Sequence, residues 1–289
     1  MGLLAVLAGT VGVAQAIETI AGTERIEVFE PNAALPKKYE GSLAAYVKAI
    51  APAHRLQVTY QKFYDPSVTE GLREMASILT TLDANGVRDG EETFFRPLQH
   101  QPVRIVTWKA GVQDGPEKQF QVVGGKYYLD TLIPWKNGKV HGVKQGFYPD
   151  GKVLSEASYV QGRLDGVSKN YEPDGFVTRS SSYRDGKRDG PLTEYWNTTR
   201  KLKKTINYKM GKVDGQVRQY YDSGKLKMEA QLWDDKYHGI QKEYDEDGKL
   251  RQARYWILDK QVSPSQFEQE FRPPTASQPA DKPASGPAK

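Results

Sequence analysis

Apolar and polar residues alternate along most of this chain, in short stretches that glycine-containing turns separate. In the stretch that begins at Leu202, every second residue up to Tyr208 belongs to one set, which is apolar at both ends. A period of two is typical of β-strands with one covered face. The clearest such stretches are 153–159, 177–183, 202–208, 226–232 and 250–256.

One short motif recurs at regular intervals. It consists of a glycine, three residues ending in Asp or His, a second glycine, and an aromatic residue five positions later. The second glycines lie 24 to 27 residues apart, at Gly90, Gly115, Gly142, Gly166, Gly190, Gly215 and Gly239. Such a fixed period indicates an array of structural repeats. In the last copy, Asp235 replaces the first glycine.

A second turn lies half a period after each motif. Asp150-Gly151, Asp174-Gly175, Ser223-Gly224 and Asp247-Gly248 supply the positive φ that tight turns need. Two turns in each period of about 24 residues leave two strands, so that one repeat is one β-hairpin. The sequence therefore predicts a mainly all-β fold, an elongated single twisted antiparallel sheet of stacked hairpins. We expect the recurring aromatics to stack across neighbouring strands: Phe147, Tyr171, Tyr195, Tyr220 and Tyr244.

Composition agrees with an extended array rather than one globular core. The chain is 38% hydrophobic and 27% charged, contains 27 glycines and 17 tyrosines, and has a mean hydropathy of −0.68. Its net charge of +5 is spread among many acids, which disfavours nucleic acid as a partner. The absence of cysteine excludes disulfides, thiolate nucleophiles and cysteine metal sites.

The sequence divides into four segments. Residues 1–16 resemble a signal peptide, with an apolar run followed by Ala14-Gln15-Ala16, so we expect cleavage after about Ala16 and a periplasmic or secreted protein. Residues 17–82 form an irregular N-terminal cap, and residues 83–262 contain the hairpin repeats. Residues 263–289 are rich in Pro, Ala, Ser and Lys and are predicted to be a disordered tail.

The cap segment is less regular than the repeats. Alternation around Ile26 and Val28, and from Leu56 to Tyr60, predicts strands, and Ser42–Ile50 suits a short helix. The stretch 67–82 fits either a helix, because Ser67 and Glu70 form a possible capping box, or a degenerate hairpin with an insertion, because it echoes residues 224–230.

The motif Gly-Lys-x-His/Asp-Gly, followed by Tyr-Tyr-x-Asp-Gly-Lys-Leu, resembles the MORN repeat variant of bacterial YwqK-like proteins. The resemblance covers about residues 83–262 and is clearest over 136–257. It implies a repeat scaffold and, since those proteins are described as antitoxin components of toxin–antitoxin modules, a toxin as one possible partner. A repeat scaffold hosts many partners, so the functional implication is weaker than the structural one.

No arrangement of residues suggests catalysis, a cofactor or a metal. The histidines His141 and His238 occupy equivalent motif positions at which other copies carry Asp, so a role in the turn explains both. The recurring acids are interpreted as turn residues that bond their own backbone. No nucleophile with its base, phosphate loop or metal-ligand pair on a helix is present, so we expect no enzyme.

The candidate binding residues are basic and follow the first glycine of the motif in successive copies. We call this set the basic rim: Lys139, Arg163, Lys187, Lys212, Lys236 and Lys260. Stacked repeats would align these cations at one edge, where they either pair with neighbouring Asp residues or receive another protein.

The leading hypothesis is a non-catalytic, exported protein-binding scaffold. The alternatives are a structural cell-envelope protein and a module that binds an anionic lipid or glycan; the sequence does not indicate an oligomeric state.

Overall fold

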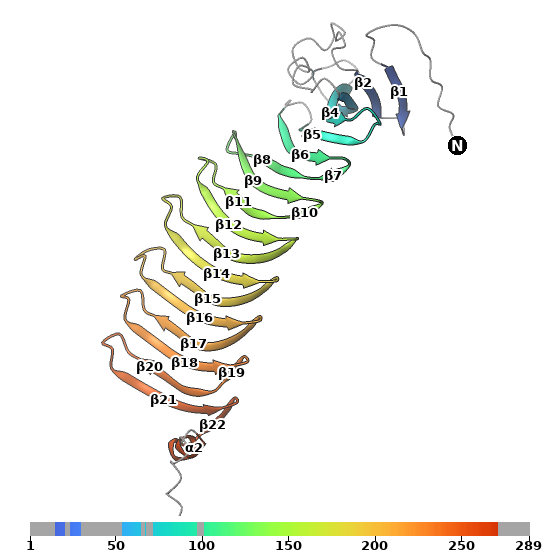
Figure 1. Cartoon of the computed structure of the whole chain (residues 1–289). Coiled ribbons are helices and arrows are strands. Elements are labelled where there is room, and N and C mark those ends of the chain that lie inside the picture. Colours follow the sequence, from blue (N-terminus) through green and yellow to red (C-terminus); the bar gives the residue numbers. More distant parts are fainter. Residues whose placement is uncertain are drawn as a thin grey trace, which may run out of the picture. The chain divides into compact units, whose positions relative to one another are not determined.

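The computed structural model describes residues 15–20, 24–29, 54–64, 67, 72–96 and 101–270. Within these residues the chain is almost entirely antiparallel β-structure, with the single helix α2 (Pro264–Glu270). The predicted all-β architecture of stacked hairpin repeats is confirmed (Figure 1). The chain forms two compact units: unit 1 runs to Val177 and includes Tyr183–Gly186, and unit 2 contains Thr178–Ser182 and the residues from Lys187 onward.

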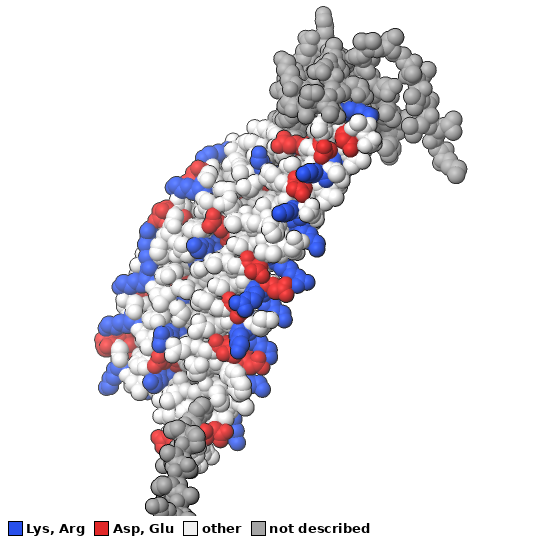
Figure 2. Space-filling model, in the orientation of Figure 1, with Lys and Arg blue, Asp and Glu red and all other residues white. Residues whose placement is uncertain are grey.

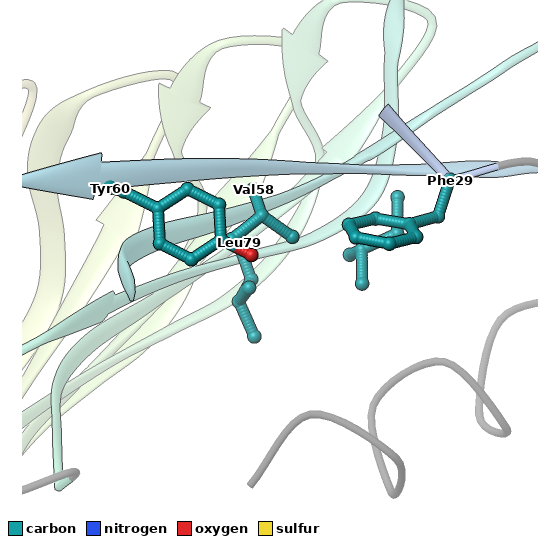
Figure 3. Close-up of a cluster of buried hydrophobic side chains, with 5 residues drawn as sticks. Phe29, Val58, Tyr60 and Leu79 are labelled. Carbon is teal, nitrogen blue, oxygen red and sulfur yellow. The ribbon is translucent and has the colours of Figure 1, made fainter. Parts of the chain in front are cut away.

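Unit 1 opens with four strands. They are β1 (Gln15–Ile20), β2 (Glu24–Phe29), β3 (Arg55–Tyr64) and β4 (Leu72–Leu82), and each pairs antiparallel with the next. The buried side chains of Phe29, Val58, Tyr60 and Leu79 meet in a small hydrophobic core (Figure 3). The strands predicted around Val28 and Val58 are confirmed. The helical alternative for 67–82 is wrong for 72–82, because β4 pairs with β3 on one side and β5 on the other.

Two predictions for the N-terminal part fall outside the described residues. These are the apolar run of the expected signal peptide, residues 1–14, and the short helix at Ser42–Ile50. Residues 15–20 are described as strand β1.

The repeats of unit 1 follow as consecutive antiparallel strands. Each strand or strand pair hydrogen-bonds to the one before it along the chain. The strands are β5 (Arg88–Phe95), β6 (Pro102–Lys109), β7 (Val112–Gln113), β8 (Gly115–Val123), β9 (Lys126–Lys136), β10 (Lys139–Val140), β11 (Gly142–Phe147), β12 (Val153–Val160) and β13 (Arg163–Tyr171). Strand β14 (Val177–Arg184) contributes residues to both units.

Unit 2 continues the same hairpin pattern. Its strands are β15 (Lys187–Tyr195), β16 (Leu202–Lys209), β17 (Lys212–Tyr220), β18 (Leu226–Trp233), β19 (Lys236–Tyr237), β20 (Gly239–Tyr244), β21 (Leu250–Ile257) and β22 (Lys260–Val262). The tail predicted from residue 263 is wrong for its first residues, because Pro264–Glu270 forms α2. The ring of Phe267 on this helix lies 5.4 Å from that of Tyr255 on β21, and this contact anchors the turn of helix. Residues 271–289 lie outside the described part.

In every motif after the first, the residue at the first glycine position lies in a two-residue turn between two strands. In the turn Met210-Gly211, which joins Lys209 to Lys212, φ is 51° and 95°. Positive φ at both central residues defines a type I′ turn, whose twist matches that of the flanking strands. We call the edge at which these turns lie the turn edge.

Met210 is a poor residue for its turn position. Its side chain is 53% exposed, so it gains little from packing, whereas Asn adopts positive φ readily. We expect Met210→Asn to stabilise unit 2 by about 0.5 kcal/mol. The urea midpoint should rise, and the reverse change at the equivalent turn residue, Asn137→Met, should lower it.

The two faces of the hairpins differ in burial. The core face contains the central residues of the strands, with Leu192, Ile206 and Val217 buried together in unit 2. In unit 2, residues on the outer face are half-buried or exposed. The predicted alternation is therefore confirmed, but its most buried position is the middle of the strand rather than the apolar ends, which are only half-buried.

The recurring aromatics do not stack on one another in the expected way. Four of the five face an aliphatic residue of the adjacent strand, as Tyr195 faces Leu202 and Tyr220 faces Leu226. Aromatics of successive motifs lie two strands apart, because each hairpin interposes a second strand, so direct stacking across neighbouring strands was a wrong prediction. The connection between motifs is instead polar: the hydroxyl of Tyr221 donates to the carbonyl of Tyr244, 2.8 Å away.

Candidate functional site

All six residues of the basic rim occupy the same structural position. Each begins the strand that follows a type I′ turn. In unit 1, Lys139 and Arg163 lie in successive hairpins. In unit 2, the same holds for the remaining four: Lys187, Lys212, Lys236 and Lys260. Figure 2 shows basic and acidic side chains mixed along both edges of the hairpins.

Hydrogen bonds between successive turns hold this edge in place. The amide of Gly138 donates to the carbonyl of Gln113 at 2.8 Å, and the amide of Gly162 donates to the carbonyl of Val140 at 2.8 Å. The motif acid adds a second bond, since Asp165 accepts from the amide of Asp185 at 3.1 Å. The motif acids therefore bond the turn of the following repeat rather than their own, whereas Asp150 in a second turn bonds its own backbone at Lys152 as expected.

His141 takes the place of a motif acid. Its Nδ1 lies 3.5 Å from the amide of Gln161, in the same geometry as the carboxylate of Asp165. The predicted turn role of this histidine is confirmed. Among the described residues, no three His, Cys, Asp or Glu side chains form a group that could hold a metal ion.

Two residues of the basic rim are neutralised by the next turn. Arg163 pairs with Asp185 at 2.5 Å, and Lys212 pairs with Asp234 at 2.7 Å. In both cases the hydrogen bond to the carboxylate raises the pKa of the basic group. Both carboxylates come from the first residue of the following type I′ turn, so that turn residue decides whether a rim cation is paired.

The other four residues of the basic rim have no acidic side chain at the start of the following turn. The turns that follow Lys139, Lys187 and Lys236 begin with Gln161, Met210 and Leu258, none of which carries a charge. Lys260 is the last rim residue, and all four side chains are exposed. Within the described part of the chain, none of these four lysines forms an ion pair. Exposed, unpaired cations at equivalent positions of the hairpins are suited to binding an anionic partner.

The sequence did not reveal a second feature, two buried glutamates in the hairpin repeats of unit 1, beside a third, Glu27, on β2. Glu92 and Glu117 are only 4% and 1% exposed, and they face Val106 and Ile133 on the neighbouring strands. They follow the second motif glycine by two residues, a position that Leu192 and Val217 occupy in unit 2. A charged residue in an alternating strand usually points to solvent, so only this comparison between repeats could have indicated burial.

Both buried carboxylates are fully hydrogen-bonded. Glu92 accepts from Thr80 and from the indole N–H of Trp108, each at 3.1 Å, and its Oε1 lies 3.3 Å from Nε of Arg88. These donors surround both oxygens of the carboxylate. A ligand would have to displace existing bonds, so we assign Glu92 to the stability of unit 1 rather than to catalysis.

Glu117 has an equivalent set of donors. Its carboxylate accepts from Arg104 at 2.7 Å, Gln119 at 2.8 Å and the indole of Trp135 at 3.0 Å. Burial by itself would raise the pKa of Glu117, but the bonds from Arg104, Gln119 and Trp135 outweigh it and hold the pKa below its usual value. Glu117 is therefore ionised at neutral pH and serves as a structural anion.

Open depressions in the described part are shallow and polar. One of about 410 Å³ is lined by residues of β21, β22 and the start of α2, including Arg254 and Gln261. Another, of about 150 Å³, lies over β18 and β20. No helix among the described residues has the length and apolar character needed to cross a membrane.

Comparisons with known proteins support the repeat assignment. Residues 140–161, 213–234 and 237–257 match the family model described as MORN repeat variant. No curated protein matches the chain. Among solved structures, a porin-like protein from Bacteroides uniformis ATCC 8492 is 11% identical, over 73% of this chain and 88% of that one, with a TM-score of 0.17, which is too low to support an argument. The chain thus contains at least three MORN-type repeats, and these indicate a repeat-based binding or scaffold module.

Proposed function

We propose that this protein is a non-catalytic, exported scaffold that binds an acidic protein at its turn edge. The observation that carries the proposal is the set of rim cations that the turns leave unpaired. The fold requires the turn but not the lysine that follows it, because Val112 holds the same position in an earlier repeat. The regular lysines are therefore available for a partner.

The resemblance to YwqK-like proteins supports one more specific version. In it, the partner is a toxin that the scaffold meets outside the cytoplasm, since the proposal includes export through the signal peptide. A structural envelope protein and a module for anionic lipid or glycan are the alternatives.

Two variants with equal charge test the proposal. The first replaces Lys139, Lys187, Lys236 and Lys260 by Gln, and the matched control replaces the lysines of the opposite turns, Lys152, Lys201, Lys225 and Lys249. Each removes four positive charges. We expect a stoichiometric partner in envelope fractions that the control retains and the rim variant loses, with binding that weakens between low salt and about 0.5 M salt.

Three results would contradict the proposal. Equal retention by both variants would exclude the rim, binding that is independent of salt would exclude an electrostatic interface, and the absence of any discrete partner would favour the structural alternative.

A further inference from the structure

Unit 1 exposes apolar side chains on its outer face. Val143 and Val160 are each 46% exposed and Val167 is 41% exposed. Val143 faces Ser158 on the adjacent strand, and Val160 follows Ser158 by two residues, so both lie on the same face. A Cβ on Gly166 would lie 2.9 Å from Cβ of Ser158, which places the bulge of Gly166 and Val167 beside Ser158 as well.

The fold does not need these valines. Val143 and Val167 directly follow the second glycine of the motif, and in unit 2 the same position is occupied by Gln216. Gln216 faces Gln231 in the same kind of bulged pairing. A polar side chain is therefore compatible with this position. Exposed valines in adjacent hairpins remain without a structural explanation.

Two lysines adjoin this apolar area at the turn edge. Lys136 and Lys139 face each other across the turn, and both are exposed. Directly opposed like charges are destabilising, and neither lysine has an ion-pair partner in the described ranges. In unit 2, Lys209 and Lys212 face each other in the same way, but there Asp234 neutralises Lys212. The pair in unit 1 lacks such an acid.

We propose that Lys136, Lys139, Val143, Val160 and Val167 form a docking surface for a protein segment that carries carboxylates beside apolar side chains. This inference rests on the proposed function and specifies where and by what chemistry the partner binds. Unpaired cations beside exposed apolar side chains complement a segment that carries the opposite charge beside apolar groups. None of these five residues is a Trp or Tyr, the residue types that anchor proteins at a membrane interface, so a protein is favoured over a membrane.

Crosslinking in the cells that make the protein tests this surface. A photoreactive p-benzoylphenylalanine replaces Val143 in the full chain, and a matched probe replaces Gln216 at the equivalent position of unit 2. We expect a single protein adduct from position 143 that position 216 does not give. That protein is then identified by mass spectrometry, purified, and used to measure dissociation constants.

Three double variants identify the contacts. Lys136→Glu with Lys139→Glu, and Val143→Gln with Val167→Gln, should each weaken binding by roughly tenfold or more. The same charge change at Lys225 and Lys249, which lie in the turns opposite the basic rim, should alter it by less than about twofold. Circular dichroism of each variant checks that the hairpins remain folded.

The remaining outcomes overturn the inference in distinguishable ways. Adducts from position 216 alone, or equal adducts from both, would reject this surface and leave the scaffold proposal standing. Lipid adducts at position 143, or loss of binding to anionic vesicles in the lysine variant, would make the occupant a membrane. Absence of adducts at both positions, together with no partner in the envelope fractions, would reject both proposals.

Discussion

Gly239→Ala should destabilise unit 2 by about 3 kcal/mol, whereas Gly248→Ala should cost only about 1 kcal/mol. Gly239 is the second glycine of its motif and has φ of 135°, outside the regions that residues with a Cβ favour. An added Cβ would also lie 2.7 Å from Cβ of Gln231, closer than carbon atoms approach. Backbone strain at this φ and steric overlap of the new Cβ with Gln231 therefore both destabilise the variant.

Gly248 is a matched control for the backbone effect. Its φ of 87° is also positive, but no atom lies within 4 Å of the position that its Cβ would occupy. Urea unfolding followed by circular dichroism gives both free energies. Equal losses for the two variants would show that the close approach to Gln231 does not contribute. Hydrogen exchange should place the loss in β18 to β21, because a repeat mainly contacts its neighbours.

Gly239 is an example of a position at which the backbone approaches a neighbouring strand so closely that only glycine fits. Such positions made the hairpins predictable from the sequence. Turn and bulge positions accept so few residue types that glycine recurs there, and a period of glycines is visible without any homologue. The same argument covers the position of the basic rim, which is fixed by its distance from the turn. Local backbone geometry therefore determined the parts of the fold that the sequence predicted.

Properties that depend on the following repeat could not be predicted in the same way. Asp185 neutralises Arg163 from 22 residues away, and which rim cation is paired depends on a single turn residue that varies freely. Burial of Glu117 likewise depends on donors from neighbouring strands. Helix α2 was missed although Ser263 and Gln266 form a capping box at its start, because one aromatic residue in a stretch of polar residues gives no periodic signal.

The exposed valines show the opposite limitation. Val143 and Val167 looked like ordinary strand residues, because alternation alone does not say which face is covered. Only the register of β11 with β12, in which Val143 faces Ser158, shows that this side chain lies on the outer face and not in the core. Val143 and Gln216 occupy equivalent positions of the two units. Because Gln216 is polar, the hairpin does not require an apolar side chain at this position.

Glu117→Gln should lower the stability of unit 1 by about 2–3 kcal/mol at neutral pH. The amide keeps the size of the side chain but removes the charge that Arg104 compensates, and it offers one oxygen where the carboxylate offers two. The loss stays below that of a fully buried pair because the side chain of Arg104 is 41% exposed and can be hydrated. Glu91→Gln, at an exposed position of β5, is the control and should have almost no effect.

The pH dependence of this variant distinguishes a structural anion from simple packing. The pKa of Glu117 is lower in the folded protein than in the unfolded chain, so its contribution is fully present above the unfolded value of about 4.3 and is lost as the pH falls through the folded value. The difference in unfolding free energy between the native protein and Glu117→Gln should therefore shrink when urea titrations at pH 7 are repeated near pH 3. A difference that stays constant between the two pH values would show that the carboxylate acts through its shape alone.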